Sequence, residues 1–352
     1  MAGEKWGNSP AMKRMPIPRG PITESLFEVL QRPPSGDPCP TVPVERPSSP
    51  LADEDLQLAL YCCYELHYGG LPDVDDRWEW QPWLLELRAR MEEVFEETLL
   101  EQIGPPHESA APEEMDLALR AIADADEAPS LSRYMLAEAT REQFEEFAIH
   151  RSAYQLKEAD PHSWALPRLS GPPKAALVEI QVDEYGGGRS ERIHATLFAR
   201  SMEALGLDSE PNAYLDSIPG VTLATVNLMS LLGLHRRWRG AIVGHLALFE
   251  MTSSIPNRRY ANGLRRLGFG GQATAFFDEH VEADAVHENI AAVDLAGGLA
   301  RQDARLGPDI LWGARALAAL DARWSLAVLG AWRDDRSSLL TSVPEVVASS
   351  SG

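Results

Sequence analysis

The pattern of apolar and polar positions predicts helices over most of the chain. In the segment from 83 to 104, Leu84, Leu87, Met91 and Phe95 recur every three or four residues, which places them on one face of a helix. Similar runs continue from about residue 111 to Trp332, and no run alternates polar and apolar residues for long in the manner of a strand. No internal repeat of roughly 20 to 50 residues is present, so a solenoid is not expected. The predicted fold class is all-α, a compact helical bundle.

Changes in composition divide the chain into four predicted regions. Residues 1–50 are rich in proline, which removes backbone donors, and are expected to form a mostly disordered lead. Residues 51–110 form a helical extension, residues 111–335 the main domain, and residues 336–352 a flexible tail. Within the extension, Glu65 and His67 resemble a ligand pair, but side chains two residues apart on a helix point in nearly opposite directions.

Charge and cysteine content limit the expected partners. The chain carries 53 acidic against 32 basic residues, a net charge of -21, which argues against binding nucleic acid or anionic membranes. Its three cysteines, Cys39, Cys62 and Cys63, cannot build a disulfide framework. The N-terminus lacks the apolar run of a signal peptide, and no stretch of about 18 apolar residues predicts a membrane span. A cytoplasmic protein is the expectation.

One segment, FFDEHVEADAVHENI at 276–290, suggests a metal site. On a helix, His280, Asp284 and His287 leave one face, because residues at i, i+4 and i+7 lie within roughly 60° of one another. Two imidazoles and a carboxylate are ligands that suit first-row metals, especially iron. Two alternatives remain open: a buried histidine pair salt-bridged by the aspartate, or the solvated face of an acidic helix.

A metal would need further ligands from other helices. Glu250 lies in the otherwise small and apolar run GAIVGHLALFE, where an unpaired carboxylate would be costly. A cation there is either a metal or an arginine such as Arg258 or Arg259. The segment EYGGGRSERIHATLF offers Glu184 and His194 as a second pair. The other histidines considered are His150, His235 and His245, of which the last two fit surface or core positions better.

The sequences ALFEMTSSIPNRRYANGLRRLG and ATAFFDEHVEADAVHENI together resemble the heme-oxygenase-like diiron oxidases and oxygenases, a family of iron-containing redox enzymes. The resemblance covers roughly residues 115 to 335 and implies a heme-oxygenase-like helical bundle. It implies that His280, Asp284 and His287 are ligands from the last core helix, and that Glu250 is a bridging carboxylate. The remaining implied ligands are Glu184 and His194.

The assignment of Glu184 rests on the resemblance alone. In a regular helix Asp183 or Glu191 would align better with His194. The intervening GGGRS makes a regular helix improbable, so Asp183 and Glu191 stay as alternatives to Glu184.

The resemblance implies a non-heme diiron oxidoreductase that uses two Fe2+ ions and O2, without heme. The reaction on a small organic substrate would be N-oxygenation, desaturation or oxidative C–C cleavage. Candidate partners are that substrate, an electron donor and a second copy of the chain. Arg258 and Arg259 could bind a substrate carboxylate, although solvated surface arginines are the alternative. The competing hypotheses are a metal-free heme-oxygenase-like hydrolase or oxidase, and a binding protein with a vestigial metal site.

Overall fold

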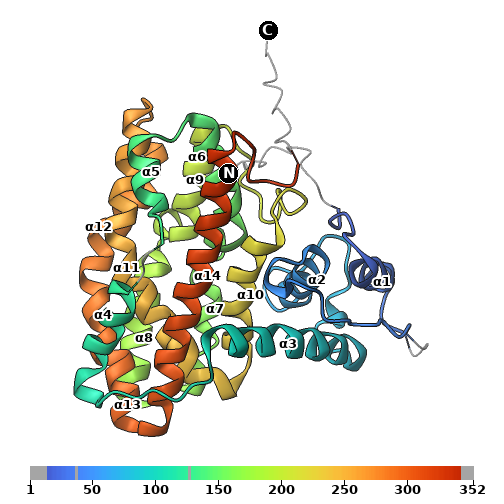
Figure 1. The fold of residues 1–352 in the computed structure, drawn as a ribbon, viewed down its shortest axis with the longest axis horizontal. Coiled ribbons are helices and arrows are strands. Elements are labelled where there is room, and N and C mark those ends of the chain that lie inside the picture. The colour runs from blue at the N-terminus through green and yellow to red at the C-terminus, as the bar shows by residue number, and fades with distance from the viewer. Residues whose placement is uncertain (1–13, 36–38, 126–127, 342–352) are drawn as a thin grey trace, which may run out of the picture.

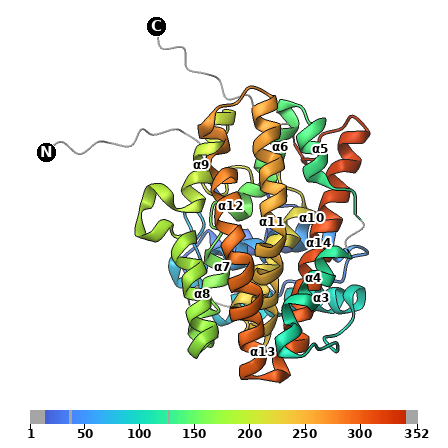
Figure 2. The same ribbon diagram turned by 90° about the vertical axis from the view of Figure 1, so that its left-hand side faces the viewer.

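The structure is a computed structural model that describes residues 14–35, 39–125 and 128–341; the side chains of residues 284 and 285 lie outside this description. Every regular element in the described ranges is helical, which confirms the predicted all-α class. Long helices run side by side along the bundle, while the first three helices form a separate layer against its side (Figures 1 and 2). No described helix is long and apolar enough to cross a membrane.

The bundle is built from helices that follow the N-terminal layer. Short helices link or precede the long ones, and a π-helical stretch, Ile290–Gly297, continues α12 directly. The bounds are α4 (Met115–Asp124), α5 (Leu131–Ala137), α6 (Arg141–Gln155), α7 (Asp160–Ser163), α8 (Gly171–Glu184), α9 (His194–Leu205), α10 (Gly220–Leu234), α11 (Arg239–Arg266), α12 (Gly271–Asn289), α13 (Gly298–Gln302) and α14 (Gly307–Arg333).

Helix α11 packs against both α12 and α14 and lies between them (Figure 2). Gly244 of α11 packs against the backbone of Ile310, and Gly313 of α14 packs against the backbone of Ala241. Any side chain at either glycine would collide with the opposite helix, so both positions need glycine for this close approach. The resulting tight pairing fixes α11, which carries part of the candidate site described below.

The N-terminal layer consists of α1 (Pro21–Leu30), α2 (Glu54–Glu65) and α3 (Pro82–Ile103). The expectation of a mostly disordered lead is wrong for α1, whose Leu26 and Phe27 are buried. Asp55 of α2 accepts hydrogen bonds from the backbone nitrogens of Ile22 and Thr23 at 2.8 and 2.9 Å. Burial of each large apolar side chain stabilises the folded state by about 1.5–3 kcal/mol. The proline content of the segment gives no sign of this apolar face. Residues 1–13 of the lead lie outside the described residues.

The start of the expected flexible tail is also held in place. Ser338 donates a backbone hydrogen bond of 2.9 Å to Glu146, and its hydroxyl lies 3.0 Å from Nε2 of His150. The Leu340 nitrogen donates to the Ser217 carbonyl at 2.9 Å. The tail expectation is therefore wrong for residues 336–341, and its remainder, 342–352, lies outside the described residues.

Candidate metal centre

Six buried acidic and histidine side chains meet inside the bundle in two overlapping groups. The first group joins Glu158, Glu184, His194 and His280, and the second joins Glu184, Glu250 and His287. Within each group, one potential ligand atom from every residue lies within 4.8 Å of the others. Glu184 belongs to both groups. Five of the six side chains were predicted from the sequence, and Glu158 was not.

The pair Glu184 and His194 is brought together by a glycine turn. Glu184 is the last residue of α8 and His194 the first of α9. Between them Gly186 has φ 65°, and a Cβ there would lie 2.6 Å from the backbone of Arg192. Only glycine tolerates this combination of positive φ and close approach. The GGGRS segment thus breaks the helix, as predicted, and turns the chain so that the two side chains face each other.

Helices α11 and α12 supply the other predicted residues. Glu250 projects from α11, while His280 and His287 lie seven residues apart, two turns along α12, and share one face. All three are buried, with 5%, 3% and 1% exposure. The buried positions of His280 and His287 rule out a solvated face for these two histidines. Asp284 lies between them on the helix, but its side chain is outside the described residues, so its role stays a prediction.

The distances within the groups are those of close ion pairs. In the first group, His194 Nδ1 lies 3.0 Å from Glu184 Oε2, and His280 Nε2 lies 3.5 Å from Glu158 Oε2. In the second group, His287 Nδ1 lies 3.4 Å from Glu250 Oε2. The pair with His287 gives Glu250 a cationic neighbour inside the site, where the sequence had suggested an arginine as the alternative to a metal.

Two of the imidazoles are oriented by hydrogen bonds on the ring side away from the carboxylates. Nδ1 of His280 donates to the Phe276 carbonyl at 2.8 Å, which leaves Nε2 toward Glu158. Nε2 of His287 donates to Asp183 Oδ2 at 3.0 Å, which leaves Nδ1 toward Glu250. Histidine ligands of metals are commonly fixed in this way, with the second nitrogen bound to a carbonyl or carboxylate.

The two alternatives to Glu184 occupy other places. Asp183 has a side chain that is 60% exposed and contacts the outer nitrogen of His287. Glu191 is exposed on the short turn before α9. Neither residue belongs to the two groups, because the glycine turn, and not helical spacing, decides which carboxylate reaches His194.

The donor set has the chemistry of a metal site. Four buried atoms of these groups have no hydrogen-bond partner among the described residues: Glu158 Oε2, Glu184 Oε2, His194 Nδ1 and His287 Nδ1. Burying such atoms unpaired costs about 1–3 kcal/mol each. The 3.0 Å between Glu184 and His194 reflects proximity without hydrogen-bond alignment, so a cation between them would satisfy both. Three carboxylates and three imidazoles suit iron.

Without a metal, histidines and carboxylates of the site shift one another's pKa values. Burial alone would lower the pKa of His287, but the carboxylates of Glu250 and Asp183 outweigh it and raise that pKa to about 9. Burial opposes the charge on Glu184, yet the neighbouring imidazoles lower its pKa, and the pKa of His194 is raised by the same pairing. Glu158 differs, because burial dominates and raises its pKa. Protons thus occupy positions where a cation would bind.

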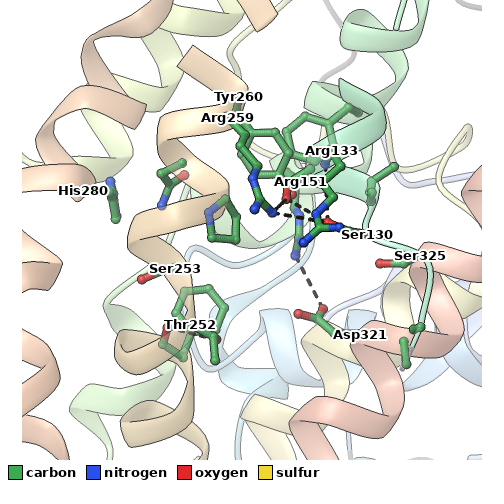
Figure 3. Close-up of a pocket in the computed structure, with 18 of the residues that line it drawn as sticks. Ser130, Arg133, Arg151, Thr252, Ser253, Arg259, Tyr260, His280, Asp321 and Ser325 are labelled. Carbon is green, nitrogen blue, oxygen red and sulfur yellow. Dashed lines mark hydrogen bonds and ion pairs between the residues drawn. The ribbon is translucent and has the colours of Figure 1, made fainter. Parts of the chain in front are cut away.

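A pocket of about 610 Å³ leads from the surface to the first group (Figure 3). Its lining includes the buried side chains of Glu158 and His280, while Arg133 and Arg259 lie toward α5 (Figure 3). Near the middle, Arg151 pairs with Asp321 across 3.8 Å and stacks over the Trp324 ring at 4.1 Å. The pocket therefore offers both cationic and anionic side chains within one cavity that two of the candidate ligands also line.

The two arginines predicted for substrate binding separate in the structure. Arg259 lines the pocket and donates to Ser132 Oγ at 3.1 Å. Arg258 is exposed and is absent from the pocket lining. Neighbouring residues on a helix point about 100° apart but can both border one cavity, as Arg259 and Tyr260 do, so their spacing alone could not separate the two arginines.

Two residues at the site could not be recognised from the sequence pattern. Glu158 lies on the turn between α6 and α7, where no periodic spacing marks a ligand. His162 of α7 lines the small space between Glu158, Glu184 and Glu250, and its Nε2 lies 3.1 Å from His245 Nδ1. Burial lowers the pKa of His162 to about 4, so the ring is neutral near pH 7.

The other histidines considered as ligands have separate roles. His150 is a core residue held between Thr222 and Ser338, at 2.8 and 3.0 Å. His235 pairs with Glu92, and His245 is the buried partner of His162.

Comparison with known proteins identifies the family. The model of a family described as iron-containing redox enzyme matches residues 145–322, just over half of the 352-residue chain. The chain belongs to this family. All six clustered residues lie within the match. Five of them are on helices or at helix ends, and Glu158 is on the turn between α6 and α7. The match thus places the chain among the iron-containing redox enzymes, the family that the resemblance implied.

A curated relative supports the same class. The chain is 31% identical over 137 residues to a nitrosourea synthase from Streptomyces achromogenes subsp. streptozoticus. The match covers 39% of this chain and 29% of the relative, so the chain aligns with less than a third of that protein's length.

Proposed function

We propose that this member of the iron-containing redox enzyme family is a non-heme diiron oxidoreductase that activates O2 to oxidise a small organic substrate. The observation that supports two ions is the sharing of Glu184 between two buried ligand groups. A carboxylate has two oxygens and can bridge a pair of metals, as in other carboxylate-rich helical bundles. The geometry favours Glu184 over the predicted Glu250 as the bridge.

The proposed ligands divide between the two ions. Glu158, His194 and His280 would hold one, Glu250 and His287 would hold the other, and Glu184, which belongs to both groups, would be shared between them. Asp284 joins the second ion in this proposal, on the strength of its spacing between His280 and His287. In this proposal the protein fixes the ligands and limits access of water, and ferrous iron held there would supply electrons for O2 reduction. An external electron donor completes the cycle.

The proposed substrate enters the pocket that Glu158 and His280 help to line. An anionic group such as a carboxylate fits against Arg259, which is the pocket-facing arginine of the predicted pair, with Arg133 close by. Arg258, predicted with it, remains a weaker candidate because its side chain is exposed. The proposed reaction types remain N-oxygenation, desaturation and oxidative C–C cleavage, and the name of the relative, nitrosourea synthase, favours a reaction at nitrogen.

The metal-free hydrolase hypothesis finds less support. Cys62 and Cys63 are buried in α2, and burial raises the pKa of Cys63 to about 12. Neither thiol lines the pocket at the candidate ligands. A buried thiol with a raised pKa is a poor nucleophile.

Iron titration tests the proposal directly. Anaerobic loading with Fe2+ should saturate at about two ions per chain, raise the melting temperature, and give optical changes when O2 is admitted. Saturation below one ion without thermal stabilisation contradicts the diiron function. Glu282→Ala, which alters a neighbouring carboxylate on α12 outside both groups, serves as the control and should load normally.

A further inference from the structure

The turn that carries Glu158 is held from outside the bundle by the N-terminal layer. α6 ends at Gln155, and residues 156–159 form a turn before α7. Glu158 therefore lacks the regular helix that supports Glu250, His280 and His287. Its position depends on what fixes the turn, and Lys157, the residue before it, makes the contacts that matter.

Lys157 reaches into α2 and the turn that follows it. Its ammonium forms an ion pair with Glu65 and lies 3.4 Å from the Tyr61 hydroxyl. The same nitrogen lies 4.5 Å from the centre of the Tyr61 ring and 4.9 Å from that of Tyr68, distances suited to cation–π attraction. We refer to Glu65, Tyr61 and Tyr68 together as the Lys157 clamp.

The clamp is itself anchored. Asn212, in the loop between α9 and α10, donates to Glu65 at 3.3 Å and accepts from the Tyr61 hydroxyl at 2.6 Å. The Tyr68 hydroxyl donates to Ser230 at 3.2 Å. The side chains of Glu65 and Lys157 are only 4% and 11% exposed, so removing one partner would leave the other charge buried and unpaired, which costs more than breaking a surface pair.

The opposite side of the turn is held by the bundle. Gln181 of α8 donates to the Ala159 carbonyl at 3.1 Å. Glu158 thus sits between one contact from α8 and the clamp from α2, and its Oε2 faces the first ligand group without a hydrogen-bond partner. The clamp residues lie outside the family match at 145–322, so this support comes from a part of the chain that the family model does not cover.

We propose that Lys157 is a positioning residue for the iron ion bound by Glu158, and that the N-terminal layer, through Glu65, Tyr61 and Tyr68, completes that half of the metal centre. This inference rests on the proposed diiron function. The N-terminal layer then contributes to metal binding as well as to packing, because Glu65 forms its ion pair with Lys157, the residue next to the candidate ligand Glu158. Loss of the clamp should loosen one ion and leave the ion held by Glu250 and His287 in place.

The test compares Fe2+ binding by full-length Glu65→Gln and Lys157→Met with wild type under anaerobic conditions. Each variant should bind the ion of the first group about 10- to 100-fold more weakly, the range seen when outer support of a metal ligand is removed. At limiting iron the content should fall from about two ions per chain toward one. Lys157→Arg, which keeps the positive charge, should restore part of the binding, and a double variant should be no worse than either single one.

Glu92→Gln provides the matched control, because Glu92 is an equally buried carboxylate of the same layer that contacts other residues. It should bind iron as wild type does. Circular dichroism and the melting temperature show whether the variants are folded. Lys157→Met keeps an apolar side chain between the two tyrosine rings, so it serves as the test if Glu65→Gln fails to fold. If folded Lys157→Met binds as much iron as the wild type, the positioning role of Lys157 is contradicted. If the wild type itself binds no iron, the proposed diiron function is contradicted instead.

Discussion

Among the described residues, two buried clusters of glutamate and histidine can be compared by how their carboxylate oxygens are satisfied. One is the candidate metal centre. The other, here called the junction cluster, consists of Glu92, Tyr64, Arg88 and His235, and lies where α2 and α3 meet the bundle. Glu92 accepts from the Tyr64 hydroxyl at 3.0 Å and from His235 Nε2 at 2.9 Å. Both oxygens of this buried carboxylate therefore have protein donors.

In the candidate metal centre, two carboxylates each keep an oxygen without such a donor in the described part of the chain. Oxygens of Glu158 and Glu184 and nitrogens of His194 and His287 remain without hydrogen-bond partners among the described residues. Burial and charge alone thus do not distinguish an ion network from a metal site, since both clusters have them. The distinguishing feature is the set of ligand atoms that face one another and that only a cation can satisfy.

The largest effect is expected from Glu184→Ala, because Glu184 belongs to both ligand groups. The variant should lose both iron ions, falling from about two per chain to none, and should show no O2-dependent optical change. Iron content after desalting measures this loss. Retention of one or more ions would show that Glu184 does not bridge, and would remove the main distinction between the two clusters.

A large effect of another kind is expected from Glu92→Gln in the junction cluster. Loss of the charged acceptor should lower the free energy of unfolding by about 2 kcal/mol, since hydrogen bonds to a buried charge are worth roughly that amount. Chemical denaturation measures it. The iron content should stay at the wild-type level. An iron deficit in the folded variant would mean that the junction cluster contributes to metal binding after all.

A smaller change in iron content is expected from Asp284→Ala. If Asp284 completes the second ion's ligands, iron content should fall from about two ions toward one, while Glu282→Ala on the same helix should change nothing. Parallel titrations of the two variants measure the difference. If both variants bind the same amount of iron, Asp284 is not a ligand and belongs with the solvated acidic residues of α12.

Helical periodicity could predict the parts of this molecule that are regular. The apolar spacing of the long segments predicts the all-α bundle, and the seven-residue separation of His280 and His287 places both on one face. Glu250 was detectable because a carboxylate in an apolar helix requires a partner. These inferences depend only on local geometry, which a sequence specifies directly.

The remaining features depend on contacts between distant segments. Glu158 lies on a turn, where no period indicates its direction, and its clamp comes from residues nearly a hundred positions earlier. Helix α1 was mistaken for disordered chain because proline content conceals the apolar face that Leu26 and Phe27 bury. Arg258 and Arg259 could not be separated, because only the position of α5 shows which of them faces the pocket.

The smallest expected effect is a difference in pH dependence between the clusters. The folded-state pKa of His287 is raised from an ordinary 6.5 to about 9, so its contribution to metal-free stability is complete below pH 6.5 and is lost as pH rises through about 9. Glu92 behaves in the opposite sense. Burial opposes its charge, but the hydrogen bond from His235 helps to lower its pKa below the ordinary 4.5, so its contribution is present above that value and lost as pH falls.

Melting temperatures of the metal-free protein in a chelator, measured from about pH 3 to about 9.5, should therefore decline on the alkaline side as well as toward acid. His287→Gln should flatten that decline, and Glu92→Gln should leave it unchanged while weakening the loss of stability toward acid. Saturating metal should also remove the alkaline decline, because a ligand that has already released its proton has none left to lose. If the alkaline decline persists in His287→Gln, the group that loses its proton in this range is another residue. The raised pKa of His287 then does not distinguish the two clusters.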